Sequence, residues 1–283
     1  MLALFITTAI RAMPSSATPP YELWLHQLGG FDATFADRSW LDRTISRRLY
    51  IHLLPIMEGT HQHRRHHAFI QAVGVPDNYL KTPSHFAEGF EAPTTKPYFV
   101  IAPGSSQNKR RWPVEHFITI ARQLLTKHPH WHCVVVGIHE ERALGEAMAQ
   151  SLGERVDNLA GKTNLLNLIR WIAHAQMLVG NDSAAVHLAA ACGIASVVIV
   201  GGGHYGRCFP YDTSEAYIRR LPLTVSESMN CFGCDWNCRY HIGRHYPFPC
   251  IAAIPTERVW SATESLLSSD NPKDRCLTYL ARM

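Results

Sequence analysis

Short apolar runs alternate with amphipathic stretches from residue 98 onward, and this alternation is the clearest pattern in the sequence. The apolar runs are rich in Val and Ile and end at Gly, Pro or Asn, which is typical of buried strands. The runs expected to form strands are 98–102, 132–136, 156–159, 177–179 and 197–200. Between and after them, apolar residues recur with helical spacing. Strands and helices in alternation predict a parallel sheet covered by helices, which is an α/β fold.

The chain before residue 98 is less regular. Residues 40–54 mix apolar and basic positions with helical spacing, and a second helix-like stretch follows at 61–74. Residues 91–96 contain two threonines and a proline and predict a linker. We therefore expect an N-terminal domain at 1–95, a C-terminal domain at 96–268 with a cysteine-rich segment at 229–250, and a tail at 269–283.

The segment Asn181-Asp182-Ser183 separates a predicted strand from a predicted helix of small residues. Asp182 or Ser183 is expected to cap this helix, since a side-chain oxygen there can accept amides of the first turn. A helix that begins after a strand also offers amides and partial positive charge to an anion. His187 lies four residues after Ser183, so both side chains face the same side. A capped helix that only packs is equally compatible with this segment.

Two further loops carry groups that could bind a nucleotide. The loop from Pro103 to Asn108 is followed by Lys109-Arg110-Arg111, so it can offer amides, hydroxyls and a cation to a phosphate. A solvated basic turn at a helix start is the alternative. Glu140 and Glu141 follow the next strand, where a carboxylate can bind ribose hydroxyls or favour a helix N-terminus. We assign the first role to Glu140 and the second to Glu141.

Composition limits the class of protein without choosing a function. Hydrophobic residues make up 46% and charged residues 18%, as in a globular protein with a sizeable core. The net charge of +4 permits an anionic substrate and does not require nucleic acid. The apolar residues 1–10 are too short to span a bilayer and lack the basic start of a signal peptide. We therefore expect a cytoplasmic protein without a transmembrane segment, whose eight cysteines are thiols or metal ligands rather than disulfides.

Cysteine and histidine clusters are the candidate metal sites. Cys231, Cys234, Cys238 and Cys250 could hold a zinc or iron ion, which would be structural because four protein ligands leave no open position. Two disulfides, or buried thiols beneath aromatic residues, remain the alternative. Histidines and arginines also crowd together at 61–67. We favour a basic helix face over a metal site there, and such a face would attract an anionic substrate.

Taken in order, these segments resemble glycosyltransferase family 9, the ADP-heptose:lipopolysaccharide heptosyltransferase family. The resemblance rests on PGSSQNKRRWPVEHF from Pro103, NLAGKTNLLNLIRWIAHA from Asn158 and VGNDSAAVHLAAACG from Val179. The segment MNCFGCDWNCRY from Met229 is similar to one found in a branch of that family. The resemblance carried by these segments spans roughly residues 98–265.

The resemblance implies a GT-B architecture of two facing Rossmann-like domains and sugar transfer with inversion, without a catalytic metal. It implies an ADP-heptose-like donor in the C-terminal domain, a glycan or lipid-linked acceptor, and a cytoplasmic enzyme peripheral to the inner membrane. The donor-binding residues that it implies are Ser105, Ser106 and Lys109 at the diphosphate, Lys162 and Thr163 at the nucleotide, and Asp182, Ser183 and His187 around the diphosphate and sugar.

The N-terminal part departs from the family pattern. The family begins with a glycine-rich strand-turn-helix that carries an acidic general base, whereas only about 95 residues precede the donor domain here. We therefore expect that the first half of the N-terminal domain is missing. Asp32, Asp37 and Glu58 are candidate bases, but nothing around them selects one, so the catalytic residues stay unassigned.

Three other functions remain alternatives. A non-catalytic nucleotide-sugar binder would keep the donor site and lack turnover, and an unrelated binding module would be stabilised by a metal at the four cysteines. A nicotinamide-dependent oxidoreductase is disfavoured, because no G-x-G-x-x-G follows the first regular strand.

Overall fold

The computed structural model describes residues 29–32, 52–55, 61–72, 89–211, 221–240, 243 and 246–268. The chain divides into two compact units, Met1–Lys81 and Thr82–Met283. The predicted boundary between residues 95 and 96 lies C-terminal to this division. The predicted tail at 269–283 lies outside the described residues.

The first unit contains two short strands and a helix. β1 (Gly29–Asp32) pairs in parallel with β2 (His52–Pro55), and α4 (Gln62–Ala72) follows. The helix predicted at 61–74 is therefore present. The stretch 40–54 has helical spacing, but its last residues, 52–54, lie in the strand β2. The parallel ladder with β1 gives the β2 backbone its hydrogen-bond partners, and this outweighs side-chain spacing.

The candidate bases fall in this unit. Asp32 is the last residue of β1, and Asp37 and Glu58 lie outside the described residues. The general base therefore stays unassigned.

The histidines of α4 are less charged than the sequence suggests. Burial, with the neighbouring His61 and His66, lowers the pKa of His63 to about 4. Burial, followed by Arg65 and His61, also lowers the pKa of His66. Both imidazoles are therefore neutral at pH 7, and the basic character of this helix comes chiefly from Arg64 and Arg65.

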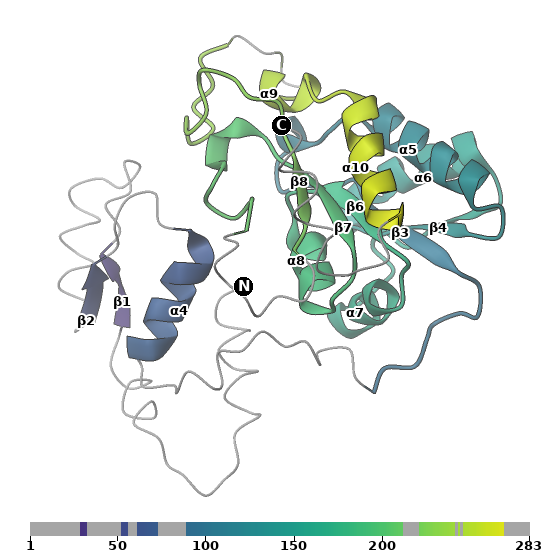
Figure 1. Cartoon of the computed structure of the whole chain (residues 1–283), viewed down its shortest axis with the longest axis horizontal. Helices are drawn as coiled ribbons and strands as arrows, with labels where there is room; N and C mark the ends of the chain where they lie inside the picture. Colours follow the sequence, from purple (N-terminus) through teal and green to yellow (C-terminus); the bar gives the residue numbers. More distant parts are fainter. Residues whose placement is uncertain are drawn as a thin grey trace, which may run out of the picture. The chain divides into compact units, whose positions relative to one another are not determined.

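The second unit is built on a parallel sheet with the strand order β5-β4-β3-β6-β7-β8 (Figure 1). Its strands are β3 (Tyr98–Ala102), β4 (His132–Val135), β5 (Val156–Asn158), β6 (Leu178–Asn181), β7 (Ser196–Ile199) and β8 (Leu223–Val225). Its helices are η2 (Asn108–Arg110), α5 (Val114–Lys127), η3 (His139–Glu141), α6 (Arg142–Leu152), α7 (Leu165–Ala173), α8 (Ala184–Ala191), η4 (Gly202–His204), α9 (Pro249–Ala252) and α10 (Thr256–Ser268). The predicted α/β class is confirmed, while β8 and α9 were not predicted.

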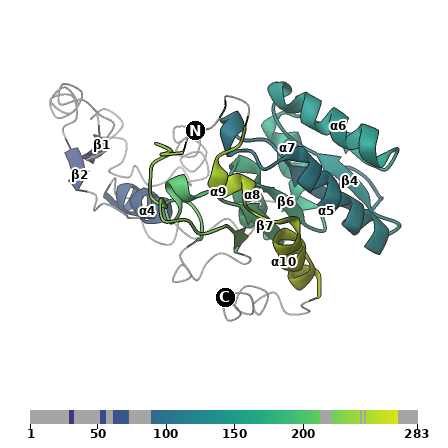
Figure 2. The same cartoon turned by 90° about the horizontal axis from the view of Figure 1, so that it is seen from above.

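Helices cover both faces of this sheet, so its central strands are apolar on both sides. Phe99 and Ile101 of β3 pack with α5, α6 and α10, and the alternate residues Tyr98 and Val100 pack with α7 and α8. Figures 1 and 2 show α5, α6 and α10 gathered on one face. Every residue of β3 is buried, as its continuous apolar run predicts.

The direction of strand order reverses beside β3. The chain moves from β3 outward to β4 and β5, then crosses back to β6 on the other side of β3. In open parallel sheets, ligands bind outside the carboxyl ends of the strands at such a reversal point. The loops after β3 and β6 are therefore the first place to look for a site. Within the described residues, no helix is long and apolar enough to cross a membrane.

Candidate functional site

The predicted donor-binding residues all lie at the carboxyl edge of the sheet. They follow four neighbouring strands: Ser105, Ser106 and Lys109 follow β3, Glu140 follows β4, Lys162 and Thr163 follow β5, and Asp182, Ser183 and His187 follow β6. Within this edge, the loops after β3 and β6 flank the reversal point, and the loops after β4 and β5 lie to one side of it.

A buried asparagine joins the two loops at the reversal point. Asn181, the last residue of β6, is 0% exposed. Its Nδ2 donates to the carbonyls of Pro103 (2.7 Å) and Gly104 (3.4 Å), and its Oδ1 accepts from the backbone amide of Trp112 (3.1 Å). These bonds satisfy backbone groups at both ends of the loop after β3. Asn181 therefore fixes the shape of the loop predicted to hold phosphate.

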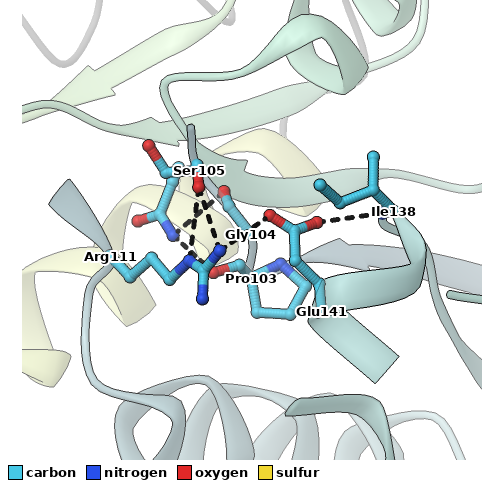
Figure 3. Close-up of polar contacts among 7 residues, drawn as sticks. Pro103, Gly104, Ser105, Arg111, Ile138 and Glu141 are labelled. Carbon is cyan, nitrogen blue, oxygen red and sulfur yellow. Dashed lines mark hydrogen bonds and ion pairs between the residues drawn. The ribbon is translucent and has the colours of Figure 1, made fainter. Parts of the chain in front are cut away.

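An ion pair supports the same loop from the side of β4 (Figure 3). Arg111 Nη2 donates to the Ser105 carbonyl at 3.1 Å and to Glu141 Oε1 at 3.3 Å. Glu141 is buried, and its other oxygen accepts from the Ile138 amide at 3.0 Å. A Cβ on Gly104 would overlap the Glu141 carboxylate, so any side chain at this position would displace that carboxylate from its contacts. Glu141 is thus a structural residue, and Arg111 is occupied by loop contacts.

The other two cations of the Lys-Arg-Arg run have different surroundings. The Lys109 ammonium lies 6.0 Å from the centre of the Phe248 ring, and the Lys109 carbonyl accepts from the Phe248 amide at 2.8 Å. The Arg110 guanidinium lies 4.3 Å from the centre of the Trp236 ring, and its Nε is buried without a hydrogen-bond partner. Burial lowers the pKa of Arg110, and the carboxylates of Asp182 and Asp235 oppose that change.

Arg110 is therefore the cation coupled to the start of α8, which sequence analysis did not single out. The sequence shows three consecutive cations with equal access to the loop, and nothing in their spacing distinguishes them. Lys109 remains a predicted diphosphate ligand. Arg110 joins the candidate residues because its side chain is both desolvated and electrostatically linked to Asp182.

The start of α8 differs in one respect from the prediction. Ser183 occupies the N-cap position, but neither its hydroxyl nor any other side chain caps the first turn, and Ser183 Oγ is buried without a hydrogen-bond partner. The first amides of a helix have no partner within the helix. Burial raises the pKa of Asp182, and the Arg110 guanidinium opposes that rise. The helix start and Arg110 together offer donors to an anion.

His187 lies against an aromatic cluster. Its ring stacks on Phe209, with centroids 4.6 Å apart, and its Nδ1 is hydrogen-bonded to the Tyr211 hydroxyl. Phe209 and Tyr211 are themselves stacked and buried. The orientation of the imidazole is therefore set by its neighbours. A side chain that contacts a sugar or a diphosphate needs a fixed orientation of this kind.

The loops after β4 and β5 lie next to each other. The Gly161 amide donates to the Gly137 carbonyl at 2.9 Å, so the residues that follow each loop are held together. Glu140 and Lys162 are exposed there, and Thr163 is half-buried. The sequence predicts Thr163 or Asn164 as the cap of α7, and Asn164 takes this role, since its Oδ1 accepts from the Asn167 amide at 2.9 Å.

The glycine triplet after β7 accommodates the cysteine-rich segment. A Cβ on Gly202 would overlap the Phe232 ring, and a Cβ on Gly203 would overlap Trp236. The Gly233 amide also donates to the Gly202 carbonyl at 2.8 Å. The close approach that glycine permits at this position is thus to aromatic side chains of the chain itself.

The cysteines of this segment are free thiols in the structure. Cys231, Cys234, Cys238 and Cys250 form no disulfide. Burial raises the pKa of Cys250, and the neighbouring thiols of the other three also raise it. Within the described part of the chain, no three His, Cys, Asp or Glu side chains are grouped closely enough to hold a metal ion. The predicted metal set is therefore not assembled in this structure.

Comparisons with known proteins agree with the segments identified above. The model of glycosyltransferase family 9 (heptosyltransferase) matches residues 46–231. Lipooligosaccharide heptosyltransferase 2 of Campylobacter jejuni subsp. jejuni serotype O:2 is 23% identical over 265 residues, which cover 87% of this chain and 78% of that protein. Lipopolysaccharide heptosyltransferase 3 of Escherichia coli K12 is 26% identical over 238 residues, covering 81% of this chain and 65% of that protein.

Solved structures support the fold. A family 9 glycosyl transferase from Veillonella parvula is similar with a TM-score of 0.55 at 18% identity, over 79% of this chain and 65% of that one. E. coli heptosyltransferase WaaC with ADP is similar with a TM-score of 0.51 at 16% identity, over 82% and 62% respectively. The chain thus spans less than two thirds of the length of these two structures. These structural similarities confirm the expected GT-B-like α/β fold.

Proposed function

The chain belongs to glycosyltransferase family 9, and we propose that it transfers heptose from an ADP-linked donor to a lipopolysaccharide-type acceptor, with inversion at the anomeric carbon. The named relatives are heptosyltransferases of lipopolysaccharide and lipooligosaccharide synthesis. The observation that carries the proposal for this chain is the half-buried Arg110 guanidinium, which interacts electrostatically with Asp182 and follows β3, where strand order reverses. The alternative of an unrelated metal-stabilised module is not favoured by the family match.

The proposed chemistry needs stabilisation of a leaving group. As the bond between the anomeric carbon and the diphosphate oxygen breaks, an acceptor hydroxyl attacks from the opposite face and loses its proton to a general base, while negative charge grows on the diphosphate. Donors that are already oriented toward that charge lower the barrier. We assign this role to Arg110, the first amides of α8 and Ser183, with Lys109, Ser105 and Ser106 as further diphosphate ligands. Asp182 and His187 are assigned to the sugar side, and Glu140, Lys162 and Thr163 to the nucleoside.

Calorimetric titration with ADP and ADP-heptose tests the donor site, and release of ADP in the presence of heptose-free lipopolysaccharide tests transfer. We expect both nucleotides to bind, and UDP to bind more weakly than ADP. Absence of binding by any nucleoside diphosphate would overturn the proposal. Binding of ADP-heptose without acceptor-dependent ADP release would instead support the alternative of a non-catalytic nucleotide-sugar binder.

The proposed reaction uses no catalytic cofactor, and a structural zinc or iron at Cys231, Cys234, Cys238 and Cys250 stays a prediction. The thiols of Cys231, Cys234 and Cys238 each raise the pKa of Cys250, and this interaction among the four cysteines supports the prediction. The thiols would have to approach one another more closely to share an ion. Elemental analysis of the purified chain is expected to give one zinc or iron per chain, lost in Cys234→Ser and retained in Cys192→Ser. A metal-free wild-type protein that melts like a chelator-treated sample would contradict this prediction.

A further inference from the structure

Asp235 and Trp236 of the cysteine-rich segment connect the loop after β7 with the loop that carries Arg110. The Asp235 amide donates to the Gly203 carbonyl at 3.0 Å, which fixes the segment on the loop after β7. Trp236 then lies beneath the Arg110 guanidinium at 4.3 Å and against Phe248, with ring centroids 5.1 Å apart. Residues far apart in the sequence therefore meet at one cation.

The backbone at this contact is unusual. Asp235 and Trp236 have φ values of 48° and 64°, the left-handed region that non-glycine residues adopt at a cost of order 1 kcal/mol each. Two consecutive residues of this kind persist only where surrounding contacts hold them. The docking on the glycine triplet and the ring contact with Arg110 are such contacts, so the turn has a reason to keep this conformation.

Charged groups surround the same turn. Asp235 forms an ion pair with Arg207 at 3.5 Å and a hydrogen bond with His204, and Arg207 lies 3.1 Å from the His204 ring nitrogen. The Asp235 carboxylate also acts on Arg110 electrostatically. Asp235 is thus fixed by its own partners while it compensates part of the buried charge on Arg110.

The two stacked side chains each carry a donor that has no acceptor among the described residues. Arg110 Nε and Trp236 Nε1 are both buried without a hydrogen-bond partner, and Ser183 Oγ at the start of α8 has none either. Buried polar groups are rarely left unsatisfied, and these three groups can all donate. Their complement is a ligand that supplies acceptors, which is the chemistry of a diphosphate.

We propose that the Asp235-Trp236 turn of the cysteine-rich segment positions Arg110 for the donor diphosphate, so that this segment sets nucleotide affinity through one cation–π contact. This inference rests on the proposed function, because it assigns the support of the same diphosphate site. Trp236 and Asp235 are positioning residues: they act on the ligand through Arg110. The cysteine-rich segment is then part of the donor site as well as a covering element of the sheet.

Calorimetric titration of ADP into the full chain tests the proposal with Trp236→Leu, Trp236→Phe and a matched control, Phe232→Leu. Phe232 belongs to the same segment and contacts Gly202 and Tyr205. Loss of a desolvated cation–π contact predicts that Trp236→Leu weakens ADP binding by about fivefold to thirtyfold. Trp236→Phe keeps a ring and is expected to restore most of the affinity. Phe232→Leu should bind ADP as the unsubstituted chain does.

A double substitution separates positioning from general damage. In an Arg110→Ala background, Trp236→Leu is expected to change ADP affinity by less than about twofold, because its effect passes through Arg110. Equal weakening with and without Arg110, or unchanged affinity in Trp236→Leu, would overturn the inference and leave the proposed function standing. Failure of the unsubstituted chain to bind ADP would remove both. Thermal melts of each variant identify any loss of fold.

Discussion

Arg110→Ala is expected to lower kcat/KM for sugar transfer by about 10²- to 10³-fold, the usual effect of removing one oriented donor from a developing negative charge. Arg110 is half-buried, so water screens its charge less than that of a fully exposed cation. Its Nε is buried and has no hydrogen-bond partner among the described residues. Removal also leaves the buried Asp182 carboxylate without the cation that opposes its raised pKa.

Lys109→Ala is the matched control for this prediction. Lys109 is the preceding cation in the same turn, and its ammonium lies over Phe248 at 6.0 Å. If Lys109 adds only a partly solvated charge, its removal should cost at most about fivefold in kcat/KM. Steady-state kinetics of ADP release, with both variants at one ionic strength, make the comparison. If Lys109→Ala is instead the more damaging change, Lys109 is the main cation at the diphosphate, as the sequence predicts.

Arg110→Lys adds a second test of geometry. Lysine keeps the charge but loses the planar stacking on Trp236 and the Nε donor. An intermediate rate is therefore expected, with kcat reduced more than KM is raised if the contact strengthens in the transition state.

The sheet could be predicted from the sequence because its signals are local. The run 98–102 coincides with β3, and Asn164 caps α7 as expected, since apolar period and cap residues act within a few positions. β8 was missed because Leu223–Val225 is short and gains its stability from pairing with β7. The strand at His52–Pro55 was mistaken for helix because its partner β1 lies far away in sequence.

The placement of the donor-binding candidates at one edge of the sheet was predictable, but the contacts of each candidate were only partly so. The order of strands and the polar loops after them placed every donor-binding candidate at one edge. Lys109, Arg110 and Arg111 differ in their surroundings because each contacts a different residue from a distant part of the chain. These partners are Phe248, Trp236 and Glu141, respectively. Sequence spacing carries no information on such contacts. The hydroxyl of Ser183 was likewise expected to cap α8, and it does not.

Asn181→Leu is expected to destabilise the second unit more than any other single change at the site. Leucine is similar in size, so the main effect is the loss of the bonds to the Pro103 and Gly104 carbonyls and to the Trp112 amide. Asn181 is 0% exposed, so water cannot replace these bonds in the folded state. Each buried group left unsatisfied costs about 1–3 kcal/mol. The sum predicts a loss of roughly 3–5 kcal/mol in the free energy of unfolding, and a fall in Tm of about 10 °C.

Asn164→Ala is the control, because it removes an asparagine whose side chain makes one exposed capping bond to the Asn167 amide. That change should cost about 1 kcal/mol. Urea and thermal unfolding, followed by circular dichroism, measure both variants. A Tm of Asn181→Leu within about 2 °C of the Asn164→Ala value would mean that the loop after β3 keeps its shape without Asn181. If the large loss is observed, ADP affinity should fall in the same variant at temperatures where it remains folded, because the asparagine that stabilises the sheet edge also shapes the loop that carries Arg110.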